Sequence, residues 1–139
     1  MITEIVAGAL LGAVFVILAR QQRPRSEAVL YAIGLVIAAI IYAGFAVAGA
    51  AEPRWMAIEF AGILPFAAFA WLGLRYSTWW LAAGWLAHPL WDTGLHLVSG
   101  TPAFVPSWYP IVCIGFDLLV AGAIAMRLLV ARAVATEAP

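Results

Sequence analysis

Five apolar runs, separated by arginines and prolines, restrict what this sequence can fold into. They lie near residues 3–20, 27–50, 55–75, 79–98 and 110–131. Each is long enough for a helix that crosses a bilayer, which needs about 20 apolar residues. Of the 139 residues, 66% are apolar and 10% are charged, so a soluble domain would lack polar side chains for its surface. The pattern predicts an all-α membrane protein, a single domain over residues 1–139 built as a bundle of five transmembrane helices.

The arginines predict how this bundle is oriented. In a five-helix arrangement, six arginines fall on one side of the membrane and Arg54 falls on the other. The six are Arg20, Arg23, Arg25, Arg75, Arg127 and Arg132. Because cytoplasmic loops are enriched in basic residues, we expect the N-terminus outside and the C-terminus in the cytoplasm, in a bacterial inner membrane. No basic segment or convincing cleavage site accompanies the first run, so we expect a retained helix and not a signal peptide.

Other features restrict the classes of function. The formal net charge is zero and no basic stripe is present, which argues against nucleic-acid binding. Cys113 is the only cysteine, so no disulfide can form within the chain, and its apolar surroundings predict an unreactive thiol. Gly8 and Gly12 form a GxxxG pattern that permits close helix packing. We expect that contact within one chain, with an oligomer as the alternative.

Polar residues inside the apolar runs are the candidates for function. The segment "AHPLWDTGLH" from Ala87 carries both histidines, His88 and His96, with Asp92 between them. Glu59 and Asp117 lie in the runs before and after it. An aspartate at the centre of a membrane helix costs about 2.5–3.5 kcal/mol on insertion scales. These five residues should therefore face one another or a wet cavity.

The five residues also agree in depth. From a helix rise of about 1.5 Å per residue, Glu59 lies about 6 Å, Asp92 about 9 Å and Asp117 about 10 Å below the outer ends of their helices. Three separate helices thus place carboxyl groups in the same outer half of the membrane. The sequence predicts that they converge on one pocket that opens toward the outer face.

Within that pocket, His88, Asp92 and His96 should form one polar stripe. Successive members are four residues apart, so each is turned by about 40° from the last. The two histidines lie about 12 Å apart along the axis, too far to bind one ion without distortion. We expect Asp92 to pair with one histidine. His88 should lie deepest and support the site through its neighbours instead of contacting a ligand, and His96 should lie near the mouth. The segment "SGTPAFVPSWYP" should cover that mouth, with Trp108 or Tyr109 at its rim.

Three interpretations fit this set of residues. Carboxylates and imidazoles are ligands that Zn, Mn and Fe accept, which predicts a divalent metal as the cofactor. Alternatively, Asp92 with His88 or His96 would act as a base and Glu59 or Asp117 as an acid. A third reading is an interhelical hydrogen-bond network that only stabilises the bundle.

Three segments together carry a resemblance to a known family. They are "EFAG" from Glu59, "AHPLWDTGLH" from Ala87 and "PSWYPIVCIGFDLLVAG" from Pro106 to Gly122. In this order they resemble a family of small bacterial multi-pass membrane proteins known mainly as hypothetical proteins. The resemblance covers the C-terminal half of the chain, implies no particular activity, and singles out the same five residues.

The sequence thus favours a membrane protein whose Glu/His/Asp pocket binds a metal ion or the polar head group of a membrane lipid. Acid–base chemistry on a lipid or isoprenoid is the associated enzymatic hypothesis. A small structural or accessory subunit of a membrane complex is one alternative. A proton or cation transporter is another, but it needs polar residues that continue to the cytoplasmic side.

Overall fold

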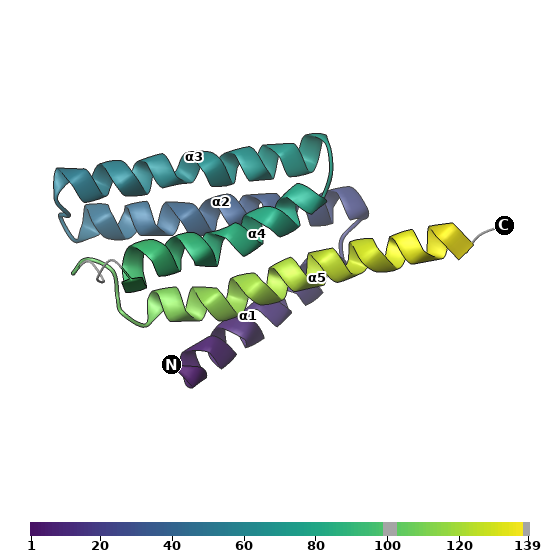
Figure 1. The fold of residues 1–139 in the computed structure, drawn as a ribbon, viewed down its shortest axis with the longest axis horizontal. Coiled ribbons are helices and arrows are strands. Elements are labelled where there is room, and N and C mark those ends of the chain that lie inside the picture. Colours follow the sequence, from purple (N-terminus) through teal and green to yellow (C-terminus); the bar gives the residue numbers. More distant parts are fainter. Residues whose placement is uncertain (99–102, 138–139) are drawn as a thin grey trace.

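The computed structural model describes residues 1–98 and 103–137 and is all-helical over them (Figure 1). The helices are α1 (Ile2–Arg20), α2 (Pro24–Ala48), α3 (Pro53–Arg75), α4 (Trp79–Asp92), the π-helix η1 (Thr93–Val98) and α5 (Tyr109–Glu137). The prediction of five helices is confirmed, since η1 directly continues α4. The helix α5 extends six residues beyond the predicted end at residue 131.

Four of the helices, α1, α2, α3 and α5, are long and apolar enough to cross a membrane. The fourth helix differs from the prediction, because the expected span 79–98 is α-helical only over 14 residues before the π-helix begins. Prolines set two of the other starts: α2 begins at Pro24 and α3 at Pro53. Proline suits the first helical position because its missing N–H would have no partner there.

The helices alternate in direction, so the connections gather at two ends of the bundle (Figure 1). One end holds the N-terminus, the α2–α3 connection and η1. The opposite end holds the α1–α2 and α3–α4 connections and the C-terminus, and most arginines lie toward it. This arrangement agrees with the grouping of six arginines that the sequence predicts; the orientation in a membrane remains a prediction.

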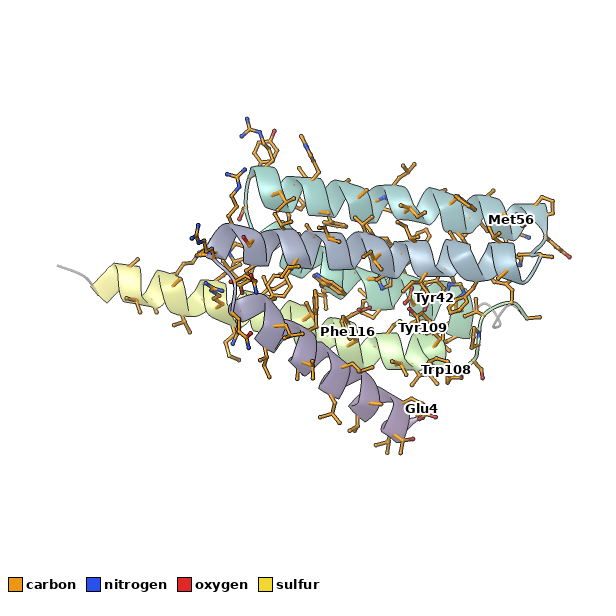
Figure 2. The ribbon with its side chains drawn as sticks, turned by 180° about the vertical axis from the view of Figure 1, so that it is seen from behind. Glu4, Tyr42, Met56, Trp108, Tyr109 and Phe116 are labelled. Atoms are coloured by element: carbon orange, nitrogen blue, oxygen red, sulfur yellow. The ribbon has the colours of Figure 1, made fainter. Side chains whose placement is uncertain are left out.

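The helix α1 packs on α5 through glycines and diverges from α2 (Figures 1 and 2). A Cβ atom added to Gly8 would lie 2.0 Å from the carbonyl oxygen of Val112, and one added to Gly115 would lie 2.0 Å from that of Ile5. Only glycine permits two backbones to approach so closely. The expectation that Gly8 and Gly12 pack against a neighbour in the same chain is confirmed.

A layer of apolar side chains fills the middle of the bundle. The rings of Phe15, Trp85 and Phe116 contact one another at centroid distances of 5.7–6.1 Å. Leu35 and Val120 belong to the same core and are fully buried. In contrast, large apolar side chains such as Leu64 on the outer faces are exposed, at 70% for that residue. An apolar exterior around a tightly packed interior is typical of helices surrounded by lipid.

At the arginine-rich end, a polar contact joins α2 to α5. Arg127 forms an ion pair with Glu27, whose side chain is buried. Nearby, the indole Nε1 of Trp85 donates a hydrogen bond to the backbone oxygen of Tyr31 at 3.1 Å. The sequence analysis placed Glu27 at the margin of an apolar run and did not predict this pair.

Candidate metal centre

The five polar residues singled out in the sequence are all buried and lie toward the α2–α3 end of the bundle. Their exposed fractions are 2% for Glu59, 1% for His88, 0% for Asp92, 0% for His96 and 1% for Asp117. They come from α3, α4, η1 and α5. The helices bring these residues into one half of the bundle, but not all of them into the single pocket that the sequence predicts: Glu59, His88 and Asp92 line one small cavity, and Asp117 lines another space.

His88 lies at the centre of one group, between two aspartates. Its Nδ1 lies 2.8 Å from Oδ2 of Asp117 on α5, which is hydrogen-bond distance. The same Nδ1 lies 3.4 Å from Oδ2 of Asp92, one turn later on α4. One ligand atom from each of the three residues lies within 4.8 Å of the others. Two helices thus bring an imidazole and two carboxylates into one compact group.

Glu59 and His96 form a second group beside the first. His96 Nε2 lies 3.5 Å from Oε1 of Glu59. His96 belongs to the π-helix, which starts directly after Asp92 and follows the disturbance of the backbone ladder at Pro89. A π-helix is wider than an α-helix and often occurs at functional sites. Here it changes the direction of His96, which points toward α3 and α2.

Tyr42 on α2 connects the two groups. Its hydroxyl donates a hydrogen bond to Oδ2 of Asp92 at 2.8 Å. Its ring stacks on the imidazole of His96 with centroids 4.5 Å apart and planes only 6° from parallel. Tyr42 is a site residue that the sequence did not single out, because a tyrosine in an apolar helix is common without any functional role. A phenol in the middle of an apolar run was the available signal, and Tyr31 in the same run carries one too.

Between α2, α3 and α4 lies a cavity of about 10 Å³, close to the room that one water molecule needs. Glu59, His88 and Asp92 line it together with Tyr42. Among the described residues, the buried atoms without a hydrogen-bond partner include Glu59 Oε1, His88 Nε2 and Asp92 Oδ1. Buried polar atoms are nearly always paired, so these atoms are available to a ligand.

Aromatic side chains close the cluster toward the α2–α3 end. Tyr109 packs edge-on against Tyr42 at 5.4 Å and against Phe45 at 5.0 Å. Figure 2 shows Tyr42 and Tyr109 close to each other. Trp55 lies on the other side of His96, with centroids 6.5 Å apart. The cluster is therefore closed at this end by aromatic rings.

Comparison with known proteins identifies the family. Residues 3–129 match a family of unknown function, DUF6010. The chain belongs to this family. The match includes α1 and α2 and is thus wider than the C-terminal half that the resemblance in the sequence covered. No curated protein and no solved structure matches the chain significantly.

In this DUF6010 chain, the predicted residues meet in a different pattern from the one expected. His88 was expected to support the site only through its neighbours. It contacts both aspartates instead, because Asp117 approaches α4 at the level of His88. His96 was expected near an open mouth, but it is fully buried and held by Tyr42. Of the covering segment, residues 99–102 lie outside the described residues. Tyr109 contacts the cluster, whereas Trp108 is 53% exposed.

Proposed function

We propose that this chain is a membrane protein that binds a divalent metal ion at His88, Asp92 and Asp117. The observation that carries the proposal is the grouping of these three ligand atoms within 4.8 Å of one another. With metal–ligand bonds of about 2.0–2.2 Å, neighbouring ligand atoms lie roughly 3 to 4 Å apart. Small side-chain shifts would bring the group to that spacing. Zn, Mn and Fe accept this mixture of imidazole and carboxylate.

The charge of the cluster supports a cation. Glu59, Asp92 and Asp117 bring three carboxyl groups into one buried region. Each ionised carboxylate removed from water costs several kcal/mol unless a nearby charge and hydrogen bonds offset that cost. Two imidazoles and the Tyr42 hydroxyl offset part of it. A bound divalent ion would offset the remaining cost of burying these carboxylates, and the carboxylate oxygens without a hydrogen-bond partner would serve as its ligands.

Around such an ion, the chain's own residues have distinct tasks. Tyr42 holds Asp92 in place through its hydroxyl, and it orients His96 through the stacked rings. His96 lies beside Glu59, with its Nε2 3.5 Å from the carboxyl Oε1, and this imidazole is placed to exchange a proton with a substrate. A bound divalent ion would polarise an oxygen atom of a substrate. We place this chemistry in the outer half of a bacterial inner membrane, with a lipid or isoprenoid as the substrate.

A structural role is the second candidate, and one observation favours it. The hydrogen bonds from Tyr42 to Asp92 and from His88 to Asp117 join α2, α4 and α5 without any ion. Such a network stabilises a bundle by itself, as a small subunit of a membrane complex would need.

Metal analysis of the purified protein separates the two candidates. After exposure to Zn, Mn or Fe and removal of excess metal, we expect about one ion per chain. Asp117→Asn should lose the ion while circular dichroism and size-exclusion profiles stay unchanged. Glu27→Gln is the matched control, because it also removes a buried carboxylate but at the arginine-rich end. Wild-type protein that retains no metal, or equal retention by Asp117→Asn, would contradict the proposal.

A further inference from the structure

A crevice of about 370 Å³ lies on the side of the cluster away from α3. Its walls come from α1, α2, α4 and α5, and most of its lining is apolar. Ligand sites of small molecules start at about 300 Å³, so the crevice has room for a chain-like molecule. It is separate from the small cavity between α2, α3 and α4.

The crevice opens sideways, to the outside of the bundle between α1 and α2. Leu11 on α1 and Ile37 on α2 line it and are 58% and 50% exposed. Both belong to helices long and apolar enough to cross a membrane. The opening exists because α1 is held against α5 by its glycines and diverges from α2 (Figure 2). In a bilayer, a molecule enters such an opening from the hydrocarbon region.

Three residues bring polar groups to the otherwise apolar lining of the crevice. Tyr109, Cys113 and Asp117 of α5 line it. Asp117 also lies within hydrogen-bond distance of His88, so one carboxyl group belongs both to the crevice and to the metal-ligand group. An apolar chain in the crevice would therefore place its polar end directly beside the proposed metal centre.

We propose that the crevice binds a membrane lipid with a long apolar chain and a hydroxyl group, which reaches Asp117. This inference rests on the proposed function, because it names the substrate class of the same centre. Three carboxylates outnumber the two charges of a divalent ion, so a phosphate or carboxylate head group would meet repulsion. A hydroxyl adds no charge to the buried site and can donate to Asp117.

Photo-crosslinking tests this inference. The probe is a long-chain alcohol with a diazirine in its chain and a terminal alkyne, added to protein in lipid nanodiscs. We expect labelled peptides from α1, α2 and α5 around the crevice. Ala38 lines the crevice, so Ala38→Phe should fill it and lower labelling by about tenfold. The control is Ala68→Phe, on an exposed position of α3 that lies outside the crevice.

Competition on the wild-type protein gives a result that does not depend on any variant. Excess unlabelled long-chain alcohol should suppress crosslinking, whereas the matching hydrocarbon and fatty acid should not. Equal labelling of the two phenylalanine variants, or equal competition by all three compounds, would overturn the inference.

Metal content separates this inference from the proposed function. Ala38→Phe should keep its metal, because the substitution lies across the crevice from Asp117 and removes no ligand. If metal binds but labelling is not confined to the crevice, the lipid inference fails and the metal centre stands. If labelling follows the expected pattern in protein that binds no metal, the metal centre fails and the lipid site stands.

Discussion

Replacing Tyr42 with phenylalanine removes a single oxygen atom from the centre of the cluster. Tyr42 is 2% exposed and Asp92 is fully buried, so the lost hydrogen bond lies out of reach of bulk water. The aromatic ring, and with it the stacking on His96, is kept. The substitution therefore tests the 2.8 Å hydrogen bond alone.

The size of the effect follows from these contacts. Hydrogen bonds to charged groups contribute about 1.5–3 kcal/mol, and one carboxylate oxygen of Asp92 already has no partner among the described residues. Groups that orient a metal ligand typically change metal affinity by about 10–100-fold. For Tyr42→Phe we expect a loss of affinity in this range, because Asp92 would no longer be held in one orientation. Titration of metal-free protein with Zn, measured by calorimetry, gives the affinity directly.

Tyr31→Phe is the matched control for this measurement. Tyr31 is another buried tyrosine of α2, but it lies near Glu27 at the opposite end of the bundle. It should keep wild-type metal affinity even if its stability changes. Equal Zn affinities for Tyr42→Phe and wild type would refute the assignment of Tyr42 as a positioning residue for Asp92.

Three further predictions concern packing, metal linkage and topology. Gly8→Ala should lower the free energy of unfolding by about 1–3 kcal/mol, because the new Cβ would overlap the Val112 carbonyl. Gly44→Ala is the control: it has open space for the Cβ and should raise the free energy of unfolding by about 0.5–1 kcal/mol. Equal effects of the two variants, measured by reversible unfolding, would contradict the packing of α1 on α5. A chelator should lower the melting temperature of wild type but not of Asp117→Asn, and a shift in both would point to binding elsewhere. A reporter inserted at Ala51 should be external and one fused to the C-terminus cytoplasmic, and the reverse would invert the predicted orientation.

The helices and the burial of the polar residues could be predicted because both follow from local rules. A run of apolar residues with arginines at its ends defines a helix without knowledge of its neighbours. Likewise, a carboxylate such as Asp117 costs too much in hydrocarbon to face lipid, so its burial follows from its position alone.

The pattern of contacts could not be predicted, because it depends on how the helices rotate and pack. Asp117 contacts His88 only because α5 approaches α4 at that level. The π-helix that carries His96 stands where the sequence predicts the last residues of a regular α-helix. The pair of Glu27 and Arg127 joins residues 100 positions apart, which no local pattern reveals.

The apolar layer in the middle of the bundle has an electrical consequence. Phe15, Trp85 and Phe116, with Leu35 and Val120, lie between the proposed metal centre and the arginine-rich end. A full crossing by one charge exchanges about 2.3 kcal/mol per 100 mV of membrane potential. A cation that enters and leaves the cluster from the same side crosses only part of this field. The occupancy of the proposed metal centre would therefore depend on voltage less steeply than a full crossing would require.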